Sequence, residues 1–226
     1  MNEGRLIVRD LGLQPYGIVW QAMKRLTNER DQNTRDELWF VEHESVLTLG
    51  QASKPEHLLQ ETNIPVVQSD RGGQVTYHGP GQLILYPLID IRRRGIGVRE
   101  MVTILEQLVI QWLAEYGVQS YTKAEAPGVY VKVSNNDAKI ASLGLRIRKG
   151  CCFHGVSINI NMDLSPFKMI NPCGYEGLRM TQLSEFIPSV EPGYANIKNQ
   201  LLELFVRQVG ASGSISISNP LQILVD

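Results

Sequence analysis

A glycine-rich loop runs directly into an apolar strand at residues 71–91, RGGQVTYHGPGQLILYPLIDI. Glycine permits positive φ angles and lets a ligand approach the backbone closely. Polar and aromatic residues are interleaved with these glycines, which a simple turn does not require. We therefore interpret residues 71–82 as a binding loop; a long structural loop is the alternative. The spacing fits neither a phosphate-binding P-loop nor a dinucleotide fingerprint, since no Gly-Lys-Ser/Thr follows.

The patterns on either side predict a mixture of helices and strands. A helix should follow Pro15, because proline is favoured at the first helical position and apolar residues then recur at helical spacing. Further helices are predicted at 98–116 and 195–209, each ended by a glycine. Strands are predicted at 38–42, 46–49, 83–91, 128–133, 139–148 and 153–161. The residues Ser134, Asn135, Asn136 and Asp137 should form the turn of a hairpin.

These elements do not alternate strictly, so we predict an α+β, or mixed α/β, fold with one main mixed sheet flanked by helices. A length of 226 residues suits one domain spanning residues 1–226. Residues 211–226 carry only weak signals.

Composition narrows the function classes. The formal net charge of −1 argues against a general nucleic-acid-binding protein. The triplet at residues 92–94, three arginines, is either a local basic patch or a solvated turn. No apolar run is long enough to span a bilayer, and the N-terminus lacks the apolar core of a signal peptide. We therefore expect a cytoplasmic protein with no membrane partner.

Three cysteines are too few for a disulfide framework, so all three should be free thiols. Cys173 lies between a proline and a glycine in NPCGYEG, residues 171–177, which predicts an accessible thiol on a turn. It is either a nucleophile or a buried structural cysteine. Cys151 and Cys152 open a predicted strand, and at least one should face the core.

Lys139 begins a mostly apolar strand, AKIASLGLR at residues 138–146. Such a lysine can extend its ammonium group to water, or it can face a site. Ser142 and Gly144 interrupt the strand, which indicates close approach by a ligand.

The four histidines differ in context. His78 and His154 are each followed by glycine and could line a site, whereas His43 and His57 should be surface or turn residues. No spacing of histidine and cysteine predicts a metal site, and no G-x-S-x-G elbow is present.

Five segments together resemble the lipoyl(octanoyl) transferase family. They are VEHESVLTLG (41–50), RGGQVTYHGPGQLILYP (71–87), GVYV (128–131), AKIASLGLRIRKGCCFHGVSIN (138–159) and NMDLSPFKMINPCG (161–174). The match extends over about residues 6–185 and departs at no position where the family's chemistry sits. The resemblance implies a fold shared with the catalytic domains of biotin and lipoate ligases.

The resemblance also implies roles for individual residues. Cys173 would carry an acyl thioester, with Lys139 as its partner. The acyl-binding residues would be Arg71, Gly72, Gly73, Gln74, Val75, Thr76, Tyr77, His78, Ser142, Leu143, Gly144, Gly155, Val156 and Ser157. The donor would be octanoyl-acyl carrier protein. The acceptors would be lipoyl domains of 2-oxoacid dehydrogenase complexes and the glycine cleavage H protein. We expect a monomer that needs no cofactor, because a thioester is already an activated acyl group.

The chemistry suits these residue types. A nearby ammonium favours the reactive thiolate, and a lysine can exchange protons with a leaving thiol and an incoming amine. Three alternatives stay open. An ATP-dependent lipoate–protein ligase of the same fold would need a nucleotide site, for which no motif is found. An amidotransferase that moves octanoyl between lipoyl-type proteins would use the same cysteine and lysine. A non-catalytic acyl-binding module would tolerate the loss of Cys173.

Overall fold

The computed structural model describes residues 6–187, 194–211 and 216–217. The prediction for the tail at 211–226 lies almost wholly outside the described residues. The described residues form three α-helices: α1 (Tyr16–Glu29), α2 (Val98–Glu115) and α3 (Ala195–Gln208). None of the described helices is long and apolar enough to cross a membrane.

The main sheet is mixed, as predicted, with strand order β12-β1-β2-β6-β10-β9-β8-β7 and β11 added beside β9. β1 pairs in parallel with β2 and β12, whereas β2, β6, β10, β9 and β8 pair antiparallel. The strands are β1 (Leu6–Gln14), β2 (Asp36–His43), β6 (Gln82–Asp90), β7 (Ser120–Tyr121), β8 (Gly128–Val133), β9 (Asn136–Arg148), β10 (Cys151–Asn159), β11 (Arg179–Met180) and β12 (Ser216–Ile217). A second sheet has the order β4-β3-β5, with β4 (Val66–Gln68), β3 (Val46–Leu49) and β5 (Thr76–His78).

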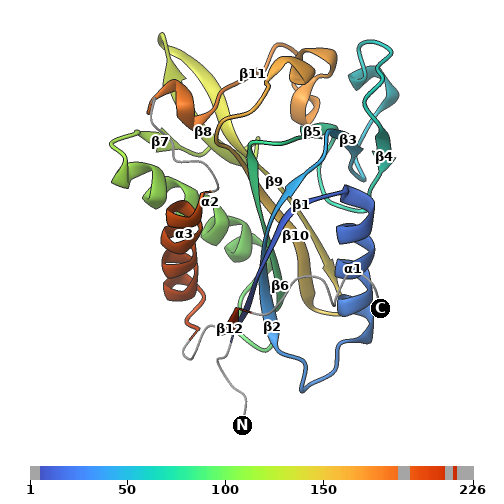
Figure 1. The fold of residues 1–226 in the computed structure, drawn as a ribbon, viewed down its shortest axis with the longest axis vertical. Coiled ribbons are helices and arrows are strands. Elements are labelled where there is room, and N and C mark those ends of the chain that lie inside the picture. Colours follow the sequence, from blue (N-terminus) through green and yellow to red (C-terminus); the bar gives the residue numbers. More distant parts are fainter. Residues whose placement is uncertain (1–5, 188–193, 212–215, 218–226) are drawn as a thin grey trace.

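Helices cover both faces of the main sheet. α2 and α3 lie together on one side and α1 lies on the other (Figure 1). Successive side chains of a strand point to opposite faces. Accordingly, Leu83 and Leu85 of β6 join the core beneath α2 and α3, whereas Ile84 and Tyr86 join the core beneath α1. The apolar run that follows the glycine-rich loop is therefore buried on both faces, which makes β6 a central strand.

The three predicted helices are confirmed. Each was predictable because its apolar residues recur at helical spacing. α1 begins directly after Pro15, and α2 is followed by Gly117 in the left-handed region, with a φ of +73°. β1 was not predicted. Its sequence LIVRDLGLQ contains two charged residues and a glycine, so it lacks a clear alternation of apolar and polar positions.

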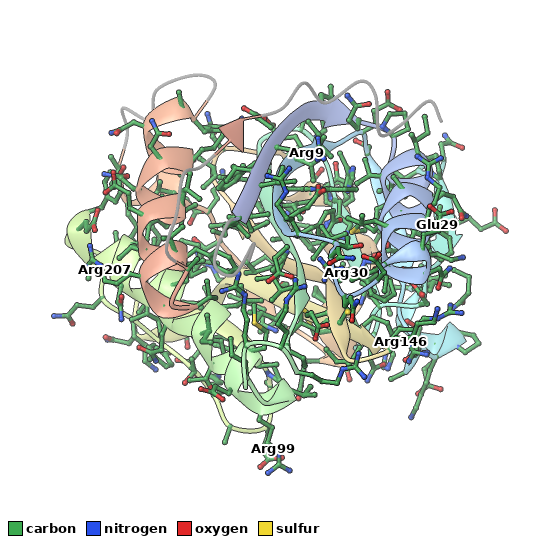
Figure 2. The ribbon with its side chains drawn as sticks, turned by 90° about the horizontal axis from the view of Figure 1, so that it is seen from below. Arg9, Glu29, Arg30, Arg99, Arg146 and Arg207 are labelled. Atoms are coloured by element: carbon green, nitrogen blue, oxygen red, sulfur yellow. The ribbon has the colours of Figure 1, made fainter. Side chains whose placement is uncertain are left out.

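Two arginines of the triplet at residues 92–94 form ion pairs that stabilise the fold. Asp36 is buried and forms ion pairs with Arg30, Arg93 and Arg94. Arg30 lies within the body of the molecule, whereas Arg99 projects outward (Figure 2). Arg93 and Arg94 therefore pair with a buried carboxylate, so the triplet is neither a free basic patch nor a fully solvated turn.

Candidate active site

A cavity of about 440 Å³ lies where the glycine-rich loop meets β9, β10 and the start of α2. Nearly all of the predicted site residues line it. They are Arg71, Gly72, Gly73, Gln74, Thr76, His78, Lys139, Ser142, Leu143, Gly144, Gly155, Val156, Ser157 and Cys173. Segments more than 100 residues apart in the sequence thus converge on one space.

Val75 and Tyr77 are the two predicted site residues that do not line the cavity. Both are buried in a separate apolar core beside the second sheet, where the Tyr77 ring packs edge-on against Phe167. The reason is the alternation of side chains along the chain: Gln74, Thr76 and His78 face the cavity, so the residues between them face away. The expectation that Val75 and Tyr77 touch the substrate has no support from this placement.

Cys173 and Lys139 lie in direct contact in the cavity wall. Lys139 Nζ is 3.2 Å from Cys173 Sγ and donates a second hydrogen bond to the Pro127 carbonyl oxygen at 2.9 Å. The Lys139 side chain is 0% exposed, so the alternative of an ammonium group extended into water is wrong. The Tyr130 ring lies 5.1 Å from Nζ and adds a cation–π contact.

Gly128 makes the space for this lysine. A Cβ atom built on Gly128 would lie 2.6 Å from Lys139 Cε and 2.7 Å from the Ala141 carbonyl oxygen. The residue also has a φ of +139°, which a side chain rarely tolerates. Its N–H donates to the Glu106 carboxylate on α2 at 2.9 Å, which anchors the start of β8.

The turn that carries the sulfur is tightly held. Cys173 sits in a short 3-10 turn, Pro172–Gly174, with φ +57° and ψ +17°. A left-handed conformation costs a non-glycine residue about 1–2 kcal/mol, and such strain is concentrated at functional sites. The Cys173 N–H donates to the Val75 carbonyl oxygen at 3.0 Å, so the turn is tied to the glycine-rich loop. Cys173 is half-buried and faces the cavity.

The other two cysteines are in a different environment. Cys151 and Cys152 are both buried at the start of β10, which confirms that at least one faces the core. Burial raises the pKa of the Cys152 thiol to about 12, so this thiol stays protonated near neutral pH.

The cavity-lining side chains Tyr16, His78 and Tyr86 pack against the ring of His43, which lies behind them. The prediction that His43 lies at the surface is wrong, since it is 0% exposed. Its Nδ1 lies 3.0 Å from the Gln14 carbonyl oxygen, which can only accept, so Nδ1 carries the hydrogen and the Tyr86 hydroxyl donates to Nε2 at 2.9 Å. Burial lowers the pKa of His43 to about 4 and that of His78 well below its usual value. Both rings are therefore neutral at neutral pH.

His154 also lines the cavity and is strained. It has a φ of +57° within β10, and its ring nitrogen Nε2 lies 2.9 Å from an Asp70 carboxylate oxygen. The same oxygen accepts a hydrogen bond from the Trp20 indole at 2.6 Å. Burial is the largest influence on His154 and lowers its pKa.

Arg71 is buried beneath the loop, and its guanidinium donates to the hydroxyl and carbonyl oxygens of Thr48 and to the carbonyl oxygen of Gly72. It fixes the glycine-rich loop to β3. Among the described residues, no group of three or more histidine, cysteine or acidic side chains could hold a metal ion.

Several lining residues were not predicted. They are Tyr16, Ala52, Ile84, Tyr86, Val98, Val102, Ala126, Pro127, Leu145 and Tyr175. The alternation within residues 83–91 already separates Ile84 and Tyr86 from the leucines, so that signal was available. The contributions of Val98, Ala126 and Tyr175 depend on long-range packing and have no local signature.

Comparison with known proteins gives one consistent family. The family described as "Lipoyl protein ligase A/B catalytic domain" matches residues 15–206. The octanoyltransferase of Histophilus somni is 55% identical, with 93% of this chain and 97% of that protein covered. The octanoyltransferase of Cellvibrio japonicus is 57% identical, with 91% and 93% covered.

Solved structures agree on the fold. A lipoate-protein ligase A bound with ATP superposes with a TM-score of 0.72 at 15% identity, covering 98% of this chain and 92% of that one. The biotin protein ligase of Aquifex aeolicus superposes with a TM-score of 0.53 at 13% identity, covering 91% and 69%. The predicted relation to the catalytic domains of biotin and lipoate ligases is confirmed. The chain therefore belongs to the lipoyl(octanoyl) transferase family and is an acyltransferase.

Proposed function

We propose that the protein moves an octanoyl group from acyl carrier protein to a lysine of a lipoyl domain, through an acyl thioester on Cys173. The acceptors would be the lipoyl domains of 2-oxoacid dehydrogenase complexes and the glycine cleavage H protein. The observation that carries the proposal is the 3.2 Å contact between Lys139 Nζ and Cys173 Sγ in the cavity wall. Octanoyltransferase relatives at 55–57% identity support the acyl group.

In the first step the Cys173 thiolate attacks the carbonyl carbon of the donor thioester. The bond from this carbon to Cys173 Sγ forms, and the bond to the carrier sulfur breaks. The departing carrier thiolate takes a proton from the Lys139 ammonium. A lysine buried against the nucleophile is suited to this transfer, because its ammonium lies 3.2 Å from Cys173 Sγ and so beside the carbon from which the carrier sulfur departs.

In the second step the acceptor lysine amine attacks the acyl carbon on Cys173. The amide bond forms, the bond to Cys173 Sγ breaks, and the amine loses a proton to the now neutral Lys139. The starting thiolate and ammonium are restored, and no external energy source is consumed. A sulfur nucleophile suits both steps, since its acyl adduct stays reactive toward an amine.

The cavity wall suits a fatty acyl chain. Ile84, Leu143 and Val156 supply apolar surface, and each buried CH₂ group contributes about 0.8 kcal/mol to binding. Burial lowers the pKa of both lining histidines, His78 and His154, so the chain does not meet a charged imidazolium at neutral pH.

The proposal is tested by offering three donors to the same lipoyl domain: octanoyl-acyl carrier protein, free lipoate with ATP, and an already octanoylated lipoyl-type protein. We expect rapid modification of the acceptor lysine only with the first. Cys173→Ala should abolish it, whereas Cys151→Ala serves as the matched control and should retain it. Modification that requires ATP would favour the ligase instead, and preference for the acylated protein would favour the amidotransferase. Full transfer by Cys173→Ala would refute the covalent route.

A further inference from the structure

We propose that the side-chain amide of Gln74 donates a hydrogen bond to the oxyanion that forms on the acyl group at Cys173. The inference rests on the proposed function and assigns a further catalytic residue to it. When Sγ attacks, the carbonyl π electrons move onto the oxygen, and this negative charge returns to the carbon as the carrier sulfur leaves. Donors aimed at that oxygen lower the barrier of acyl transfer.

Backbone N–H groups beside a nucleophile are frequent donors for such an oxyanion, but here they are occupied. The N–H of Cys173 donates to the Val75 carbonyl oxygen at 3.0 Å. The N–H of Gly174 donates to Asn171 at 2.9 Å, and that of Tyr175 donates to Pro172 at 3.1 Å. The turn that carries the sulfur therefore stabilises itself and leaves the developing charge to another group.

Lys139 is not well placed to fill this role as well. One of its hydrogens is donated to the Pro127 carbonyl oxygen and another faces Cys173 Sγ. In the proposed mechanism this lysine gives a proton to the departing carrier sulfur, so it becomes neutral during the first step. A separate neutral donor keeps the oxyanion stabilised while the lysine changes charge.

Gln74 lies directly against the residue after the nucleophile. A Cβ atom built on Gly174 would lie 2.2 Å from Gln74 Nε2 and 2.4 Å from Gln74 Cδ, so only glycine leaves room for the amide there. Gln74 and Cys173 both line the cavity. The hydrogen bond from Cys173 to Val75, the residue after Gln74, holds the two segments together.

The amide is also unused in the structure. Among the described residues, no hydrogen bond engages the Gln74 Nε2 donor, and the buried Oε1 acceptor has no partner either. The Nε2 hydrogens are therefore available to the acyl oxygen on Cys173.

The test compares Gln74→Leu, which has nearly the same shape but no donor, with Gln107→Leu on the exposed face of α2. Single-turnover formation of the Cys173 adduct from octanoyl-acyl carrier protein should slow about 10²- to 10³-fold for Gln74→Leu, with little change in KM. Gln107→Leu should match the unaltered protein. Gln74→Glu, which replaces the donor by an acceptor, should be at least as slow.

Infrared spectra of the adduct made with a ¹³C-labelled carbonyl separate a direct hydrogen bond from a mere positioning effect. The carbonyl stretch should shift to higher frequency in Gln74→Leu, because the hydrogen bond is lost. An unchanged rate, or a slower rate with an unchanged carbonyl stretch, would overturn the assignment of Gln74 while leaving the transferase proposal intact. Absence of any Cys173 adduct in the unaltered protein would overturn both.

Discussion

Replacing Gly128 by alanine tests how the active site holds its lysine. The added Cβ would lie 2.6 Å from Lys139 Cε and 3.1 Å from Lys139 Nζ. It would also lie 2.7 Å from the backbone oxygen of Ala141, which cannot move without disturbing β9. We therefore expect the lysine side chain to be displaced and its contact with Cys173 Sγ to be lost.

The substitution should lower both the stability of the protein and its rate of acylation. The φ of +139° lies in a region sparsely populated by residues with a side chain and should cost about 1–3 kcal/mol, and the overpacking about 1–3 kcal/mol more. Loss of a positioned acid–base group lowers the rate about 10²- to 10⁴-fold. The variant should thus unfold at lower denaturant concentration and form the Cys173 adduct at least 10²-fold more slowly.

Gly117→Ala is the matched control. Gly117 also has a positive φ, +73°, but an added Cβ would meet nothing within 4 Å. It should lose about 1–2 kcal/mol of stability from backbone strain while retaining its rate. Urea unfolding and single-turnover acylation of both variants separate the two effects. A folded Gly128→Ala protein that acylates as fast as Gly117→Ala would refute the reasoning.

Three further predictions follow from individual residues. Gly73→Val should block acyl loading by filling the cavity wall, and should also cost about 1–2 kcal/mol because φ at this position is +79°; unchanged loading, followed by mass spectrometry, would count against the cavity as the acyl site. The pKa of His43 lies at about 4 in the folded protein, below its ordinary value of 6.5, so on acidification this histidine is protonated in the unfolded chain first. The free energy of unfolding should therefore fall by up to about 3 kcal/mol between pH 6.5 and pH 4. Urea unfolding across that range should show a smaller loss for His43→Gln, and an equal loss would exclude His43 as the cause. Asp36→Asn should cost about 3–5 kcal/mol, because it leaves buried arginines without their carboxylate, yet leave the transfer rate of the folded protein unchanged; a near-native midpoint in urea would contradict this.

The elements with strong periodicity were predictable from the sequence. The apolar stripes of α1, α2 and α3 and the alternation along β10 reflect burial against a single sheet, and burial is what selects those patterns. β1 escaped prediction because charged residues and a glycine interrupt its pattern. Its place in the sheet depends on pairing with β2, which local sequence does not encode.

The site was predictable in composition but not in geometry. The motifs pointed to Cys173, Lys139 and most of the glycine-rich loop, yet not to the burial of the lysine, which depends on Gly128 and the Pro127 carbonyl oxygen. His43 stands between two glutamates and therefore reads as a surface residue. Its burial depends on a hydrogen bond to Tyr86, 43 residues away, that no local pattern reveals.

The most direct test of the covalent intermediate is intact-mass spectrometry of the protein mixed with octanoyl-acyl carrier protein and no acceptor. We expect a gain of one octanoyl group, located on Cys173 by peptide mapping and discharged when a lipoyl domain is added. Cys173→Ala should gain nothing. An octanoyl adduct of equal yield in Cys173→Ala, or transfer to the acceptor without any adduct on the unaltered protein, would contradict the account.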